Sequence, residues 1–165
     1  MDTTPPHTPV LLHEVLKELN PPTSQRFIDA TVGAGGDAEA ILKATAPDGQ
    51  VLALDADPAA LDIARQRLAS YGHRVFFVTV NFDQVAYIAR SNDFVPVQGI
   101  LFDLGLSSMH LSTTNRGFSF QSDGPLDMRF DPKSPTTAAD LVNNLSQTEL
   151  ADVIYRFGEE RASRA

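Results

Sequence analysis

The sequence contains no cysteine among its 165 residues. A disulfide framework and thiolate ligation of zinc or an iron–sulfur cluster are therefore excluded. No window approaches the ~18 uninterrupted apolar residues that a membrane span needs. Residues 1–10 also lack the basic stretch and apolar run that begin a signal peptide. We therefore expect a soluble, unexported, cytoplasmic protein.

Basic residues are scarce, because 13 Lys and Arg stand against 21 Asp and Glu and give a formal net charge of −8. Lys and Arg side chains on a binding face neutralise the phosphates of nucleic acid. The negative net charge therefore argues against electrostatic binding of nucleic acid over a broad surface. The four histidines, His7, His13, His73 and His110, show no ligand spacing with carboxylates, and we expect no metal site. Apolar residues are plentiful at 42%, which is enough for the core of one domain.

Strand and helix patterns alternate along the chain as far as Asp103. Strands are predicted at 27–30, 51–54, 75–80 and 97–102, and helices from Thr8-Pro9 to Leu19, over 38–46, from Asp57-Pro58 and over 82–90. Strands that alternate with helices pair in parallel through right-handed crossovers, and parallel strands covered on both faces are continuously apolar. The predicted fold class is therefore α/β, with a doubly wound parallel sheet and helices on both faces.

The pattern changes after Asp103. Gly, Ser, Asp and Pro dominate from 104 to 135, and a connection of that length is functional or disordered. Two helices are then predicted from their capping residues, one from Thr136 or Thr137 through Leu145 and one from the capping box at 146–149 to Gly158. No fifth strand follows, and a four-stranded sheet leaves exposed edges. We therefore expect a fragment of a longer protein, with a further helix starting at its last residues.

A glycine turn follows the first predicted strand. Gly33, Gly35 and Gly36 let the backbone approach a ligand where any side chain would collide. The spacing Gly33-x-Gly35-x-x-Ala38 also satisfies the dinucleotide fingerprint, which makes a nicotinamide-dependent oxidoreductase one alternative. A close-packed turn without a ligand is the other.

Three carboxylates end predicted strands. Asp29 lies four residues before Gly33, where it either caps a turn or meets a ligand ammonium; S-adenosylmethionine, a cation without phosphate, fits there better than a pyrophosphate. Asp55 lies 20 residues after Gly35 and can accept both ribose hydroxyls of an adenosine ligand. Asp103 ends the fourth strand, where open α/β sheets place their ligand crevice. Its carboxylate can accept the N–H protons of a base amine that attacks a methyl group, hold the cofactor, or cap a turn.

Aromatic and basic residues are interleaved in the loop 115–131. This mixture suits stacking on an unpaired nucleotide and contact with its phosphate, although aromatic side chains also pin irregular loops to a sheet. The candidate substrate-binding residues are Arg116, Phe118, Phe120 and Arg129. Phe82, after the third strand, suits either an adenine face or ordinary core packing.

Several of these segments together resemble the RsmH (MraW) family of bacterial ribosomal RNA cytosine-N4 methyltransferases. The resemblance is collinear and covers almost the whole chain. Its sequences are HTPVLL at 7–12, DATVGAGG at 29–36, LDADP at 54–58, LFDLGLSS at 101–108, RGFSF at 116–120, DGPLDMR at 123–129 and GEER at 158–161. The RGFSF and DGPLDMR segments are far more specific than a glycine turn, so the resemblance favours this family over a dinucleotide-binding enzyme.

The resemblance implies a class I methyltransferase domain that uses S-adenosylmethionine to methylate a cytidine in the decoding centre of the small ribosomal subunit. Its partner would be small-subunit ribosomal RNA or the assembled subunit. It also implies a domain organisation of 1–111 as the N-terminal part of the methyltransferase domain, 112–135 as a substrate or cofactor loop, and 136–165 as the start of an inserted helical domain. A truncated, non-catalytic fragment of such an enzyme is the alternative.

Carried over by position, cofactor contacts fall on Gly35, Gly36, Asp37, Asp55, Phe82, Asp103 and His110. Two of these depart from the family pattern. The family usually has His where this chain has Asp37, and Gln where it has His110. Asp37 lies at a predicted helix N-terminus, which favours a negative charge, and His110 can donate and accept hydrogen bonds as Gln does.

Overall fold

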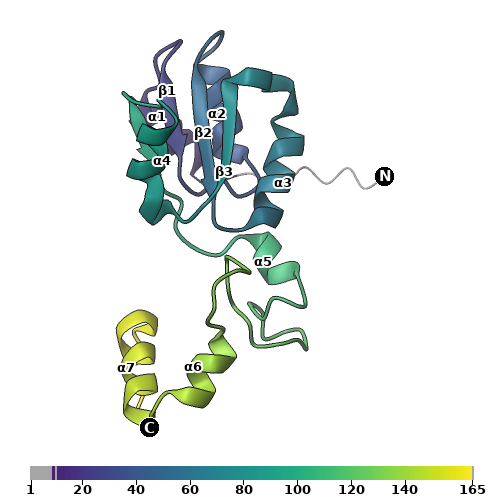
Figure 1. Ribbon diagram of the computed structural model, residues 1–165, viewed down its shortest axis with the longest axis vertical. Coiled ribbons are helices and arrows are strands. Elements are labelled where there is room, and N and C mark those ends of the chain that lie inside the picture. Colours follow the sequence, from purple (N-terminus) through teal and green to yellow (C-terminus); the bar gives the residue numbers. More distant parts are fainter. Residues whose placement is uncertain (1–8, 10, 165) are drawn as a thin grey trace. The chain divides into compact units, whose positions relative to one another are not determined.

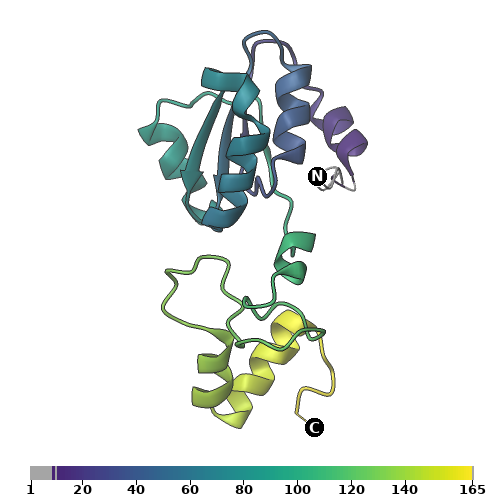
Figure 2. The same cartoon turned by 90° about the vertical axis from the view of Figure 1, so that its right-hand side faces the viewer.

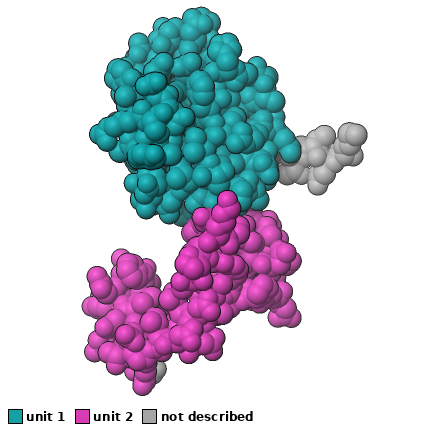
Figure 3. All heavy atoms as spheres, viewed as in Figure 1, with its two compact units in different colours: residues 1–105 teal, residues 106–165 magenta. Residues whose placement is uncertain are grey.

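The computed structural model describes Pro9 and residues 11–164. The chain divides between Gly105 and Leu106 into two compact units, unit 1 and unit 2, which Figure 3 shows in different colours. This division lies closer to the N-terminus than the boundary predicted after residue 111, and the domain organisation stays a prediction. The predicted helix start at Thr8 lies outside the described residues.

Unit 1 is built on a four-stranded sheet in which all strands are parallel (Figure 1). The strand order is β3-β2-β1-β4. The strands are β1 (Arg26–Asp29), β2 (Gln50–Asp55), β3 (Val75–Thr79) and β4 (Gly99–Leu101). The predicted α/β fold with a parallel sheet is therefore confirmed.

Helices connect the strands of unit 1. They are α1 (Leu12–Leu19), α2 (Gly36–Ala44), α3 (Pro58–Arg67) and α4 (Val85–Ser91), with 3₁₀ segments η1 (Ala69–Arg74) and η2 (Phe82–Gln84). Helix α3 begins at the predicted Asp57-Pro58, where the Asp57 carboxylate caps it by accepting the N–H of Ala59 at 2.9 Å. Helix α1 begins only at Leu12, later than the predicted start at Thr8-Pro9.

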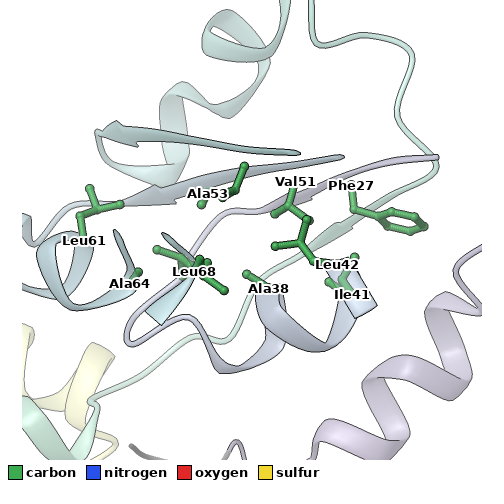
Figure 4. Close-up of a cluster of buried hydrophobic side chains, with 11 residues drawn as sticks. Phe27, Ala38, Ile41, Leu42, Val51, Ala53, Leu61, Ala64 and Leu68 are labelled. Atoms are coloured by element: carbon green, nitrogen blue, oxygen red, sulfur yellow. The ribbon is translucent and has the colours of Figure 1, made fainter. Parts of the chain in front are cut away.

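The core of unit 1 has two layers, because side chains along a strand point alternately to opposite faces. Phe27, Val51 and Ala53 pack with side chains of α2 and α3 (Figure 4). Ile28 and Leu52 belong to the cluster on the other face, which α4 covers; Figure 2 shows the sheet between the two helical layers. Full burial of side chains of this size contributes roughly 1.5–3 kcal/mol each.

Unit 2 contains α5 (Ser108–Ser112), α6 (Ala138–Asn144) and α7 (Gln147–Gly158). The predicted capping box at 146–149 is confirmed, with Ser146 capping α7. Of the two predicted candidates for the cap of α6, Thr137 is the residue that caps it. Helix α7 ends at Gly158, as predicted, and the left-handed residue that follows it is Glu159, with φ 53°. Residues 161–164 form a turn where a further helix was predicted. No helix in the described part of the chain is long and apolar enough to cross a membrane.

Candidate functional site at the carboxyl edge of the sheet

The carboxyl ends of the three adjacent strands β2, β1 and β4 carry the predicted carboxylates. Asp29 is the last residue of β1 and Asp55 the last of β2, while Asp103 follows the end of β4 by two residues. In the register of the sheet, Asp29 lies beside Ala53 on one side and Leu101 on the other. Because parallel strands end at the same edge, the topology brings all three carboxylates to one edge of unit 1.

The glycine turn between β1 and α2 has two different parts. A Cβ on Gly35 would lie 3.3 Å from Leu68 Cδ1, and one on Gly36 would lie 2.6 Å from Pro9 Cδ. Both glycines therefore allow close packing within the protein, as the plainer interpretation expected. Gly33 differs, because a Cβ there would meet nothing nearer than the Thr31 carbonyl oxygen at 3.9 Å, and its φ of 51° favours glycine. Its backbone is the part of the turn open to a ligand.

Asp55 fixes this turn from the side of β2. Its Oδ2 accepts the N–H of Gly33 at 2.8 Å, and its Oδ1 accepts the N–H of Asp57 at 2.9 Å. The same side chain thus shapes the turn and lies at the carboxyl edge of the sheet.

Asp29 is buried, with only 1% of the residue exposed. Its pKa is raised from the usual 3.8 to about 7, mainly by burial and also by the nearby carboxylates of Asp37, Asp55 and Asp103. The N–H of Thr31, which donates to Asp29 Oδ1 at 3.2 Å, acts in the opposite direction. Asp37, in the first turn of α2, is itself 8% exposed. The edge therefore holds mutually repelling carboxylates that a cation would stabilise.

Two aromatic rings lie beyond the ends of the outer strands. Phe82 begins η2 after β3, and Phe102 follows β4; their ring centroids are 5.9 Å apart at an interplanar angle of 87°. Phe82 is 41% exposed, so it is not the core residue that the plainer interpretation expected. Its exposed face remains available to a planar ligand.

In unit 2, His110 lies in α5 within a cluster of rings. The residue is 8% exposed, and its ring centroid lies 5.1 Å from that of Phe118 and 5.0 Å from that of Phe130. Its Nδ1 accepts the N–H of Ser107 at 3.1 Å, which completes the cap of α5. The rings of His110, Phe118 and Phe130 therefore pack on one another within unit 2.

Both predicted loop arginines bind atoms of their own loop. Arg129 forms an ion pair with Asp127 at 2.7 Å, and its side-chain bonds hold the pKa of Asp127 down, at about 2. Arg116 donates to the carbonyl oxygens of Arg129 and Phe130 at 2.7 and 3.1 Å. Phe120, in contrast, is 100% exposed. The loop is thus held by its arginines and presents the ring of Phe120 fully to solvent.

Among the residues that the structure describes, no group of three or more His, Asp or Glu side chains is arranged to hold a metal ion.

Comparison with known proteins decides the family. Residues 4–165 match the family described as the MraW methylase family. The chain belongs to this family. The resemblance of its sequence motifs is therefore confirmed.

Curated relatives carry the name ribosomal RNA small subunit methyltransferase H. The protein of Thermomicrobium roseum is 54% identical over 154 residues, which cover 93% of this chain and 47% of the relative. That of Dehalococcoides mccartyi strain BAV1 is 49% identical over 159 residues, covering 96% of this chain and 46% of the relative. The chain thus spans about half the length of these MraW family members.

Among solved structures, a protein described as a putative rRNA-methylase from Clostridium thermocellum superposes with a TM-score of 0.47 at 22% identity. The superposition covers 58% of this chain and 50% of that one. Family membership rests on the sequence matches, and the sheet topology of unit 1 rests on its own strand pairing. The individual cofactor and substrate residues stay predictions.

Proposed function

We propose that this chain forms the cofactor-binding half of a methyltransferase that uses S-adenosylmethionine to methylate a cytosine N4 in small-subunit ribosomal RNA. Its membership of the MraW family supports the reaction class. The observation that carries the proposal is the acidic edge of unit 1, where Asp55 bonds the backbone of Gly33 and the turn residue Thr31 bonds Asp29 and Asp103.

The acidic edge of unit 1 favours binding of a positively charged ligand. Burial is the main cause that raises the pKa of Asp29 to about 7, and the neighbouring carboxylates of Asp37, Asp55 and Asp103 act in the same direction. A positive charge at the edge would relieve the repulsion among these carboxylates, and a pyrophosphate would increase it. S-adenosylmethionine carries an ammonium and a sulfonium and no phosphate. A nicotinamide dinucleotide would place its pyrophosphate at the glycine turn, against these carboxylates. The charge pattern therefore favours the methyl donor.

The residues present fit this cofactor. Asp29 and Asp37 would receive the methionine ammonium, and the Asp55 carboxylate at the end of β2 would accept the ribose hydroxyls. The exposed ring of Phe82 would pack on the adenine. His110 is assigned to the cofactor by resemblance alone.

When bound, S-adenosylmethionine supplies an electrophilic methyl group. The cytosine amine is a poor nucleophile because its lone pair is delocalised into the ring. The Asp103 carboxylate, exposed at the edge, would accept an N–H of this amine and take up the proton that N4 releases as its bond to the methyl carbon forms. Asp103 would thus return electron density to N4 at the moment of attack.

For the RNA, the loop of unit 2 offers the fully exposed ring of Phe120. Phe120 would stack on an unpaired base, while Arg116, Phe118 and Arg129 keep the loop in shape. Phosphate contacts are limited by the net charge of −8. The partner would be small-subunit ribosomal RNA, free or in the assembled subunit, in the cytoplasm.

The direct test is transfer of a labelled methyl group to small-subunit RNA by the full natural protein, with this chain assayed beside it. Asp103→Asn is expected to lower kcat by about 10²-fold or more, the scale of a lost general base. Phe120→Ala is expected to raise KM for RNA about tenfold, the scale of one lost stacking contact. Phe157→Ala is the matched control, because Phe157 is 79% exposed but lies at the end of α7.

The position of the label identifies the product. N4-methylcytidine in the digested RNA is the expected result, and a label on any other atom would overturn the proposal. Full activity of Asp103→Asn would remove Asp103 from the chemistry. Cofactor binding without methyl transfer by this chain, beside an active full protein, would identify the chain as a non-catalytic half.

A further inference from the structure

Thr31 lies in the turn after β1 and forms hydrogen bonds to both sides. Its backbone N–H donates to Asp29 Oδ1 at 3.2 Å, and its Oγ1 accepts the backbone N–H of Asp103 at 2.7 Å. Asp29 is buried and Asp103 is exposed. The three residues therefore connect the interior of unit 1 to the candidate catalytic carboxylate at its surface.

The bond from the Asp103 N–H to the Thr31 hydroxyl extends the pairing of β1 and β4 beyond the last main-chain hydrogen bond. The main-chain ladder between β1 and the β4 segment ends where the N–H of Ala30 donates to the Leu101 carbonyl oxygen at 2.9 Å. The segment 102–107 has no helix or strand. One step beyond the last rung, the Thr31 hydroxyl takes the place of a main-chain acceptor and holds the Asp103 N–H. Such a bond fixes the backbone from which the Asp103 side chain extends.

The turn is anchored on its other side as well. Gly33, two residues after Thr31, donates its N–H to Asp55 at 2.8 Å. The short turn from β1 to α2 is thus tied to β2 through Asp55 and to the β4 segment through Thr31. The proposed cofactor residues and the Asp103 backbone therefore meet in one hydrogen-bonded turn.

We propose that Thr31 is a positioning residue, whose hydroxyl sets the place of Asp103 for proton acceptance. This inference rests on the proposed methyl transfer. Misplacement of a reacting group by about 1 Å costs about 10²-fold in rate. The hydroxyl of Thr31 bonds Asp103, whereas its backbone N–H bonds Asp29. Loss of the hydroxyl alone should therefore lower kcat and leave cofactor affinity nearly unchanged.

Two substitutions separate the hydroxyl from the shape of the side chain. Thr31→Val removes the acceptor and keeps the volume, and Thr31→Ser retains the hydroxyl. In the full natural protein, Thr31→Val is expected to lower kcat about tenfold to a hundredfold with the Kd for S-adenosylmethionine within about twofold. Thr31→Ser is expected to recover most of the rate. Thr79→Val is the control, because Thr79 is an exposed threonine at the carboxyl end of β3.

A second readout does not depend on activity. Amide hydrogen exchange of Asp103, followed by NMR, is expected to be at least about tenfold faster in Thr31→Val than in the wild type, with Thr31→Ser close to the wild type. An unchanged exchange rate at Asp103 would show that the Thr31 hydroxyl does not hold the Asp103 backbone. Faster exchange with unchanged kcat would overturn its role in the reaction, as would equal losses of kcat and cofactor affinity. If the wild-type protein transfers no methyl group, the proposed function fails, and the exchange result alone decides whether Thr31 holds Asp103.

Discussion

The two units are stabilised by different interactions. In unit 1, strands β1 and β2 and the helices that cover them bury a continuous set of apolar side chains. In unit 2, Phe118 and Ala151 are the apolar residues buried among those that the structure describes. Its order comes instead from three side-chain helix caps and from arginines bonded to loop carbonyl oxygens. Burial stabilises the first unit, and local hydrogen bonds shape the second.

This difference affects how functional groups are positioned. In unit 1, Asp29 and Asp55 take their places from the ends of buried strands, so the core that stabilises the fold also arranges the acidic edge. In unit 2, the side chains of Arg116 and Arg129 arrange the loop that presents Phe120. We therefore expect core substitutions to lower the stability of unit 1 strongly. Loss of a single polar contact should lower the stability of unit 2 by a smaller amount.

The largest effect is expected in the core of unit 1. Leu52→Ala removes a side chain with 0% exposure at the centre of β2, and such substitutions cost about 2–5 kcal/mol through lost burial and a cavity. Leu11→Ala is the control, because Leu11 is 61% exposed, and its cost should stay within about 0.5 kcal/mol. Urea unfolding measures both. Equal costs for the two variants would contradict the burial account of unit 1.

An intermediate effect is expected from the buried charge at Asp29. The folded protein keeps a proton on this carboxyl up to about pH 7, whereas the unfolded chain loses it near pH 3.8. The folded state thus binds more protons between these values, and its stability falls as pH rises through that window. Asp29→Asn cannot ionise, so its stability relative to the wild type should rise by up to about 1.4 kcal/mol per pH unit up to pH 7.

Urea unfolding of the wild type and of Asp29→Asn at pH 5 and pH 8 measures this difference. Asp48→Asn serves as the control, because Asp48 is exposed in the turn before β2 and its replacement should leave the slope unchanged. The same dependence on pH in the wild type and in Asp29→Asn would show that Asp29 ionises normally in the folded protein.

The smallest effect is expected in unit 2. The Ser146 hydroxyl accepts the N–H of Glu149, and the Glu149 carboxylate accepts the Ser146 N–H at 2.9 Å. Ser146→Ala removes the first bond and should cost about 1 kcal/mol, measured as lower helicity and earlier thermal unfolding of α7. Ser70→Ala is the matched control, since Ser70 is exposed in η1. If Ser146→Ala lowered stability as much as Leu52→Ala does, the stability of unit 2 would depend on more than local contacts.

The sequence predicted unit 1 well because its signals are local and repeated. Four apolar runs, each followed by a helix or a turn, determine a parallel sheet, and parallel strands bring their carboxyl ends together. Asp29 and Asp55 were therefore placed correctly at the strand ends. The family resemblance added Asp37 and His110, which no spacing rule selects.

The remaining site features depend on contacts between distant segments. Thr31 contacts Asp103 across 72 positions of sequence, and a threonine in a glycine turn gives no signal of that partner. The loop arginines suggested phosphate contacts, but the structure gives them partners within their own loop. Phe118 and Phe120 are two residues apart, yet one is 9% exposed and the other 100%, a difference that only the folded loop determines.

The most direct test of the acidic edge is calorimetric titration of this chain with S-adenosylmethionine, with NADH as the comparison ligand. We predict saturable binding of S-adenosylmethionine, at least about tenfold weaker in Asp55→Ala through loss of a charge-assisted hydrogen bond, and unchanged in Asp48→Ala. We predict no binding of NADH. Binding of NADH alone, or equal affinity of the wild type and Asp55→Ala for S-adenosylmethionine, would contradict the account.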